Sequence, residues 1–165
     1  MSKVLFISDL HFGHRNILTY RPDFSSIEEH DRTIIERWNS VVATRDLVWI
    51  LGDVYLTEER DDYPSFMEIF NKLKGNKRII TGNHDKVKYY PANIVHNALT
   101  KRYGLWLSHA PIHPQELMGK INLHGHCHLK SVPDNRYINV CCEQINYTPI
   151  TLEQIRARIG ATNAG

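Results

Sequence analysis

Five short apolar runs, each followed within a residue or two by side chains that bind metal ions, constrain this chain more than any other feature. A run of four or five apolar residues bounded by Gly, Asn or Asp is typical of a buried β-strand. Ligands of open α/β sheets bind at the carboxyl ends of the strands. We therefore expect five strands to deliver polar side chains to one site. The motifs are Asp9-Leu10-His11, Gly52-Asp53, Gly82-Asn83-His84-Asp85, Ser108-His109 and Gly125-His126-Cys127-His128.

The first half of the chain predicts strands that alternate with helices. Apolar residues recur at helical spacing after Ser26, and Ser26 with Glu29 forms a capping-box pattern. A βαβαβ order predicts parallel strands with helices outside them. The expected elements are a strand at residues 4–8, a helix over Ser26–Val42, a strand at Leu47–Leu51, a helix with Pro64 in its first turn, and a strand at Arg78–Thr81.

After about Ile94 the pattern changes to short strands without intervening helices, which predicts a second, more antiparallel sheet. A last helix is expected to begin at Thr151. The predicted fold class is α/β, a four-layer α/β/β/α sandwich of two mixed sheets flanked by helices. It would form one domain over residues 1–160, with a disordered tail at 161–165 and long loops at 55–63 and 110–120. The later strands are expected near Ile94 and at Leu105–Ser108, Ile121–His124 and Tyr137–Cys142.

Composition narrows the class of protein. A chain of 165 residues is long enough for one domain with a core, and its net charge of +2 gives no support for nucleic-acid binding. No apolar stretch approaches the roughly 20 residues that span a membrane. The amino terminus carries no signal-peptide pattern, so we expect a cytoplasmic protein with reduced cysteines at Cys127, Cys141 and Cys142. The oligomeric state stays open.

The spacing inside two motifs places polar side chains in pairs. Asp9 and His11 are two residues apart, as are His126 and His128. A two-residue step at the end of a strand returns to the same side, so each pair can face one ion. By the same alternation, Cys127 is expected to point to the opposite side.

The seven candidate ligands are too many for one Zn²⁺ ion, which usually takes four. They suit two ions that share a carboxylate, and Asp53 is the expected bridge because it lies in the middle of the set. Nitrogen and oxygen ligands favour Mn²⁺, with Fe, Zn²⁺ or Ni²⁺ as alternatives, over metals that prefer thiolates. The set consists of Asp9, His11, Asp53, Asn83, His109, His126 and His128.

These motifs, in this order from Asp9 to His128, resemble those of the calcineurin-like metallophosphoesterase superfamily, in particular its small stand-alone bacterial and phage members. The resemblance implies a two-sheet sandwich and two catalytic metal ions. It further implies His84 as the catalytic histidine, paired with Asp85. It implies one ion held by Asp9, His11, Asp53 and His128, and another held by Asp53, Asn83, His109 and His126.

The chemistry of such a site assigns further roles. Two cations about 3.5–4 Å apart can activate a bridging water, whose hydroxide attacks phosphorus, and can neutralise phosphoryl oxygens. His84 is not needed as a ligand and is expected to assist the leaving group, oriented by Asp85; the alternative for Asp85 is a cap on the following turn. His14 and Arg15 are expected to contact substrate, and the alternative for Arg15 is a solvated side chain.

We therefore interpret the chain as a two-metal phosphoesterase acting on a small phosphoester, nucleotide-derived compounds included. A phosphodiester is favoured because no cap domain or additional arginine clamp is evident; a phosphomonoesterase acting on nucleotides or phosphoproteins is the alternative. Protein phosphatases of the superfamily continue the second motif with Asp-Arg-Gly and have Glu at the position of Asp85, and this chain does neither. A non-catalytic scaffold would be expected to lose ligands, and none is lost.

Overall fold

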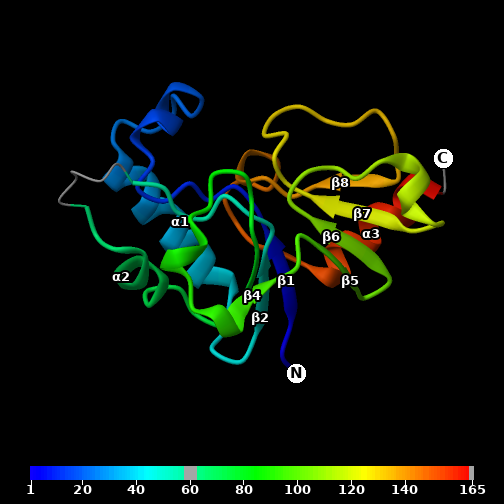
Figure 1. Cartoon of the computed structure of the whole chain (residues 1–165), viewed down its shortest axis with the longest axis horizontal. Helices are drawn as coiled ribbons and strands as arrows, with labels where there is room; N and C mark the ends of the chain where they lie inside the picture. The colour runs from blue at the N-terminus through cyan, green and yellow to red at the C-terminus, as the bar shows by residue number, and fades with distance from the viewer. Residues whose placement is uncertain (58–62, 164–165) are drawn as a thin grey trace.

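The computed structural model describes residues 1–57 and 63–163, which form two β-sheets with helices outside them. Figure 1 shows α1 (Ile27–Val41) and α2 (Phe66–Phe70) to the left of the first sheet. The second sheet and α3 (Leu152–Asn163) lie to its right in the same view. The predicted sandwich of two mixed sheets between helices is confirmed.

The first sheet has five strands in the order β4-β3-β2-β1-β9. Its first four strands pair in parallel, and β9 joins β1 antiparallel. The inner strand β1 is buried on both faces, with Leu5, Phe6 and Ile7 fully inaccessible, as expected for a parallel strand covered on both sides. The strands are β1 (Val4–Ile7), β2 (Leu47–Ile50), β3 (Asn76–Ile80), β4 (Val95–His96) and β9 (Ile150–Thr151).

The helix beginning at Ile27 agrees with its sequence signals. The hydroxyl of the N-cap Ser26 accepts a hydrogen bond from the Glu29 backbone N–H, at 3.1 Å. The Glu29 carboxylate accepts instead from the backbone and hydroxyl of Ser25, so the capping box is incomplete. Ile34 and Trp38 on the inner face are fully buried, which holds α1 against the sheet.

The prediction that Pro64 lies in the first turn of α2 is wrong. Ser65 is the N-cap, and the first helical residue is Phe66. The Ser65 hydroxyl accepts from the Glu68 backbone, while the Glu68 carboxylate accepts from the Ser65 backbone at 2.7 Å. This reciprocal pair satisfies two donors at the helix start and therefore fixes the beginning of the helix after Pro64.

The prediction of a more antiparallel second sheet is also wrong. The order is β5-β6-β7-β8; β5 and β6 form an antiparallel hairpin, but β6–β7 and β7–β8 are parallel. The loops at 109–120 and 125–136 are long enough to return the chain to the start of the next strand. The carboxyl ends of β6 and β7 therefore lie at one edge. The strands are β5 (Leu99–Arg102), β6 (Leu105–Ser108), β7 (Ile121–His124) and β8 (Tyr137–Asn139).

The two sheets are joined at Ser8, directly after β1. Its backbone N–H donates to the carbonyl of Val140 (2.9 Å), and its carbonyl accepts from the N–H of Cys142 (3.0 Å). Because the residues after Asn139 pair with Ser8 of the first sheet, strand β8 ends at Asn139 and does not extend to Cys142 as predicted.

Five short 3₁₀ turns complete the described structure: η1 (Arg15–Thr19), η2 (Val87–Tyr89), η3 (Ala92–Ile94), η4 (Pro114–Leu117) and η5 (Cys142–Gln144).

The end of the chain differs from its prediction. Helix α3 continues to Asn163, so residues 161–163 are helical, whereas the prediction placed them in a tail; residues 164–165 of that tail lie outside the described residues. The same is true of residues 58–62 in the predicted loop at 55–63. Across residues 1–57 and 63–163, every helix is too short or too polar to cross a membrane.

Candidate metal centre

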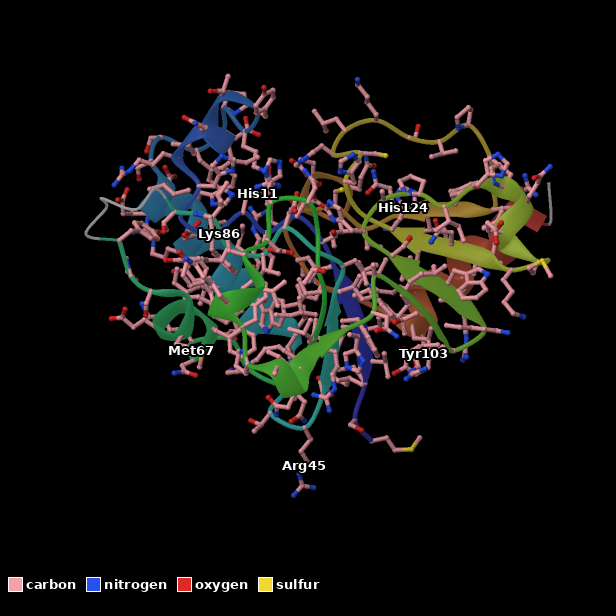
Figure 2. All side chains as sticks on the ribbon, in the orientation of Figure 1. His11, Arg45, Met67, Lys86, Tyr103 and His124 are labelled. Atoms are coloured by element: carbon pink, nitrogen blue, oxygen red, sulfur yellow. The ribbon has the colours of Figure 1, made fainter. Side chains whose placement is uncertain are left out.

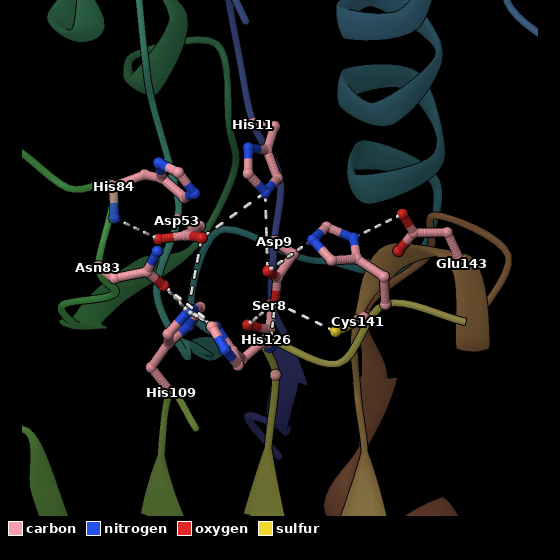
Figure 3. Close-up of polar contacts among 12 residues, drawn as sticks. Ser8, Asp9, His11, Asp53, Asn83, His84, His109, His126, Cys141 and Glu143 are labelled. Carbon is pink, nitrogen blue, oxygen red and sulfur yellow. Dashed lines mark hydrogen bonds and ion pairs between the residues drawn. The ribbon is translucent and has the colours of Figure 1, made fainter. Parts of the chain in front are cut away.

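The seven candidate ligands lie together where the strand ends of both sheets meet, and Figure 3 labels all of them except His128. Figure 2 places one of them, His11, between the two halves of the molecule. Side chains far apart in the chain are thereby brought within contact distance, as the motifs predict. Asp9 and His11 follow β1, Asp53 follows β2, Asn83 follows β3, His109 follows β6, and His126 and His128 follow β7.

Five of these residues adopt the left-handed backbone conformation, which is uncommon outside glycine but is tolerated best by Asp, Asn and His. The alternation of an extended strand, in which residues two apart face the same side, therefore does not apply to Asp9 and His11 or to His126 and His128. Consistent with this, Cys127 lines the same cavity as its neighbours and does not lie on the opposite side. Strained positions of this kind cost about 1–3 kcal/mol each and concentrate at functional sites. The φ values are 57° at Asp9, 51° at His11, 52° at Asp53, 68° at His126 and 48° at His128.

The carboxylate of Asp9 is fully buried, and its two oxygens have different surroundings. Oδ2 accepts from the Ser8 hydroxyl (2.6 Å), the His126 backbone N–H (2.9 Å) and the Cys141 thiol (3.1 Å). Oδ1 is buried and has no hydrogen-bond donor. Burial alone would raise the pKa of Asp9, but favourable contacts, led by that with His11, hold it well below its ordinary value. An ionised oxygen without a donor therefore faces the cluster.

Two imidazole nitrogens approach this bare oxygen. Asp9 Oδ1 lies 3.6 Å from His11 Nε2 and 3.5 Å from His128 Nε2. His11 Nε2 is likewise buried without a partner. His128 Nδ1 donates to Glu143 (2.8 Å), so Nε2 of the neutral ring carries a lone pair. Lone pairs and a carboxylate oxygen directed at one point repel each other unless a cation lies between them, so this cluster fits a metal ion.

A second cluster lies beside the first. Asn83 Oδ1 is 3.0 Å from His109 Nε2 and 3.1 Å from His126 Nδ1, and the two histidine nitrogens are 3.2 Å apart. His109 Nδ1 donates to the Leu51 carbonyl (2.8 Å), which leaves Nε2 of the neutral ring available to a ligand. This set of one amide oxygen and two imidazole nitrogens also suits a divalent cation.

Asp53 lies between the two clusters. Its Oδ2 is 3.4 Å from His109 Nε2 and 3.7 Å from His11 Nε2, while Oδ1 accepts from the His84 backbone N–H (3.0 Å). A side chain at Gly82 would overlap Asp53 Oδ1, so the backbone after β3 can approach this carboxylate only because residue 82 is glycine. The position of Asp53 is the one expected of a shared ligand.

Glu143 and Arg21 support the first cluster, and the sequence motifs do not indicate either residue. Glu143 Oε1 accepts from His128 and from Arg21 Nε, both at 2.8 Å. Arg21 is 1% exposed and also donates to the backbone carbonyl of Asp9 (2.6 Å). Burial would raise the pKa of Glu143, but the contacts with His128 and Arg21 lower it to about 2. A permanent carboxylate therefore orients His128.

His84 lines the cavity beside the clusters but belongs to neither. Its ring centroid is 5.8 Å from that of His11 and 6.1 Å from that of His14. Figure 3 shows the ring on the same side of the site as His11. This is the position expected of a group that contacts substrate without binding metal.

The expectation that Asp85 orients His84 is wrong. Asp85 Oδ2 accepts from the backbone N–H groups of Asp53 (2.8 Å) and Gly82 (2.7 Å), and Oδ1 accepts from Val54 N–H (2.8 Å) and from the Tyr90 hydroxyl. Both oxygens are thus engaged with the loops after β2 and β3. Asp85 holds the backbone on which Asp53 is carried, which is close to the alternative role of a turn cap.

His14 and Arg15 have different surroundings. His14 lines the cavity, and its Nδ1 is 3.0 Å from Nδ1 of His11. Burial, with the charges of His11 and His84, lowers the pKa of His14 to about 4, so the ring is neutral at pH 7. Arg15 is exposed, lies 3.8 Å from Glu28 and does not line the cavity. The structure does not support the expected substrate contact of Arg15.

Comparison with known proteins agrees with this geometry. The sequence model for calcineurin-like phosphoesterases matches residues 2–156. The chain belongs to the calcineurin-like phosphoesterase family. It is therefore a metal-dependent hydrolase of phosphoric esters, and the residues described above include groups able to hold a metal ion.

Relatives of this phosphoesterase include proteins without an assigned activity. An uncharacterized protein of Methanocaldococcus jannaschii is 37% identical over 94% of this chain and 90% of its own length. A probable cyclic nucleotide phosphodiesterase of Coxiella burnetii is 27% identical over 61% of this chain and 37% of its own length. The crystal structure of a protein of unknown function from Aquifex aeolicus has a TM-score of 0.74 at 25% identity, covering 95% of this chain and 99% of that one.

Replacing Glu143 should weaken metal binding, and it should also lower the stability of the fold because the buried Arg21 loses its carboxylate partner. Glu143→Gln keeps the shape but removes the charge that orients His128, and loss of such a partner typically costs about 10–100-fold in metal affinity. Titration calorimetry with Mn²⁺ measures this affinity. Glu153→Gln, at an exposed position of α3, is the matched control and should bind as the wild type does. Equal affinity in both variants would contradict the role given to Glu143.

Metal binding should become tighter as pH rises from 7 to 9. Burial favours neutral His109, but its contacts with Asp53 and Asp9 dominate and raise the pKa to about 9 in the metal-free protein. A cation must displace this proton, so apparent affinity should rise about tenfold per pH unit for one proton released, and level off above pH 9. Calorimetry in buffers of different ionisation enthalpy counts the protons; none released at pH 7 would refute this.

The raised pKa of His109 also affects the stability of the metal-free protein, which should fall as pH rises. The folded pKa of His109 lies above its ordinary value of 6.5. Protonation therefore stabilises the metal-free protein fully below pH 6.5, and this stabilisation is lost as pH rises through about 9. Chemical denaturation after chelation, at pH 6 and pH 9, separates this effect from metal binding.

Proposed function

We propose that this chain is a two-metal phosphodiesterase that uses Mn²⁺. One ion would be held by Asp9, His11, Asp53 and His128, and the other by Asp53, Asn83, His109 and His126. The observation that carries the proposal is the position of Asp53, whose Oδ2 lies within 3.7 Å of a nitrogen from each cluster. A pair of divalent cations supplies, when bound, an activated water and positive charge for the phosphoryl oxygens.

Side chains of the protein would orient the candidate ligands and supply a proton to the leaving group. Neutral His14 and the Glu143 carboxylate keep His11 and His128 in the orientation that their ligand nitrogens require. His84, whose imidazole lines the cavity outside both clusters, would hold a proton for the departing oxygen of the ester. Asp85 fixes the backbone that carries Asp53 and has no part in proton transfer.

The cavity lining favours a diester over a monoester. A phosphomonoester is doubly charged near neutral pH, and sites for it commonly include arginine, which binds phosphate through two parallel hydrogen bonds. Among the described residues that line this cavity there is no arginine, and Lys130 is the one lysine or arginine side chain. Similarity to a probable cyclic nucleotide phosphodiesterase also supports a nucleotide-derived diester as substrate.

A substrate panel tests the proposal directly. The Mn²⁺-loaded protein should hydrolyse bis(p-nitrophenyl) phosphate and cyclic nucleotides with higher kcat/KM than p-nitrophenyl phosphate. Higher kcat/KM on the monoester would make the chain a phosphomonoesterase. Parallel assays with Fe, Zn²⁺ and Ni²⁺ test the choice of metal.

Asp53→Asn should lose one metal ion and nearly all activity. The change places a neutral amide between two cations, removing the charge that holds both, while the similar shape preserves the fold. Metal content by elemental analysis and kcat on the aryl diester are the measurements. Asp23→Asn, at an exposed position outside the cavity, should keep two ions and full activity. Two ions and retained activity in Asp53→Asn would contradict the shared-ligand assignment.

His84→Ala should keep both ions and lower kcat in a way that depends on the leaving group. General acid assistance contributes about 10²–10⁴-fold, and it matters most for an alkoxide, since a nitrophenolate leaves readily without a proton. The loss should therefore be larger for a cyclic nucleotide, which releases a ribose oxygen, than for the nitrophenyl diester. The measurement is kcat on both substrates, with metal content checked.

The control for this variant is His113→Ala, an exposed histidine that does not line the cavity. An equal loss on both substrates in His84→Ala would argue against proton donation and make His84 a group that positions or neutralises the phosphoryl oxygens. Loss of one ion would instead make His84 a metal ligand.

A further inference from the structure

We propose that the cavity in front of the metal centre contains a subsite for a flat aromatic group of the substrate, such as a nucleobase, formed by Tyr20 and Leu129. This inference rests on the proposed function, because it concerns the part of the ester that the metal ions do not bind. It assigns a specificity role to two residues outside every sequence motif.

The exposure of these two side chains is the first observation. Seven large apolar side chains among the described residues are exposed, and two of them, Tyr20 and Leu129, line the cavity that contains His11, Asp53 and His84. Each is 72% exposed. Apolar side chains that line a cavity are removed from water when a ligand covers them, and this burial favours binding.

The backbone that carries Tyr20 is held in place. The N–H groups of Tyr20 and Arg21 both donate to the carbonyl of Ile17, at 2.9 and 3.0 Å. Ile17 is 3% exposed, and the Arg21 side chain is fixed to the backbone carbonyl of Asp9. Tyr20 therefore projects from a turn that is anchored directly to the metal-ligand loop, so its exposed ring is presented from a fixed point.

Leu129 is presented in a similar way. The Asn139 side-chain amide donates to the carbonyl groups of His128 (3.0 Å) and Lys130 (3.1 Å), the residues on either side of Leu129. Gln144 Nε2 also donates to the His128 carbonyl, at 2.9 Å. Pinned backbone on both sides limits the collapse of an exposed leucine onto the protein. The backbone positions of both residues are thus fixed before a ligand binds, which lowers the entropy lost on binding.

The size and lining of the cavity indicate what it accepts. Its volume is about 820 Å³, within the range of pockets for drug-sized ligands and far more than a phosphoryl group requires. The metal-binding groups supply much of its polar lining. Ile17, Tyr20 and Leu129 supply apolar lining, and Asn16 and Lys130 add hydrogen-bonding groups. An aromatic ring with polar edges fits this combination, because tyrosine stacks on any base face.

A binding experiment tests the subsite without hydrolysis. Adenosine 5′-monophosphate and ribose 5-phosphate carry the same phosphate and sugar, and only the first has a base. The Mn²⁺-loaded wild type should bind the first about tenfold more tightly, a typical effect of one stacking contact. Tyr20→Ala should abolish this ratio while leaving affinity for ribose 5-phosphate unchanged. Tyr20→Phe, which keeps the ring, should retain the ratio, and Leu129→Ala should reduce it.

Met118→Ala is the control, because Met118 is 77% exposed but lies outside the cavity. Equal affinity of the wild type for the two ligands, or an unchanged ratio in Tyr20→Ala, would overturn the subsite. Failure of the proposed function looks different: the protein would not hydrolyse the aryl diester, whether or not it distinguishes the two ligands in binding. The two proposals can therefore fail separately.

Discussion

The arrangement of the site depends on how the carboxylate of Asp9 is held. Three donors fix its Oδ2, and they come from the end of β1, the loop after β7 and the segment after β8. A side chain at Gly125 would overlap both Ser8 and Asp9, so the close approach of the two sheets requires glycine there. Oδ1 is left directed at the histidines. The same contacts that align the sheets therefore expose one charged oxygen to the cluster.

Three of the four candidate ligand histidines, His11, His109 and His128, share one arrangement: one ring nitrogen contacts a group outside the cluster, and the other faces the cluster. His128 uses Nδ1 to reach Glu143, His109 uses Nδ1 to reach the Leu51 carbonyl, and His11 uses Nδ1 to contact His14. These outer contacts set which nitrogen carries the proton and which presents a lone pair. The orientation of these three candidate ligands is thus set by contacts within the fold.

The sequence predicted what is local and missed what depends on long-range packing. The apolar strands and the Ser26 cap follow from residues close together in the chain, and the gathering of the seven candidate ligands follows from the rule that the carboxyl ends of strands form one binding edge. The parallel direction of β6, β7 and β8 does not, because a polar loop carries no signal of whether it turns back or crosses over. The role of Asp85 was missed because its backbone partners come from a neighbouring loop.

Two residues outside the motifs were also missed, because long-range packing brings them to the site. Glu143 and Cys141 lie beyond the last motif, and only the pairing of the segment after β8 with Ser8 brings them to the cluster. The left-handed backbone at Asp9 and His11 also escapes pattern analysis, which assumes an extended strand. It does have a chemical signature, however, since the residue types that tolerate this conformation are among those that bind metal.

The junction of the sheets at Asp9 has a consequence for folding kinetics. Asp9 and His126 are 117 residues apart, so their contact closes a long loop and is entropically costly before the rest of the chain is in place. We therefore expect this junction to form late, after the transition state for folding. Interactions that form late slow unfolding and have little effect on the folding rate. An ion bound across the junction would then govern how long the protein stays folded, not how quickly it folds.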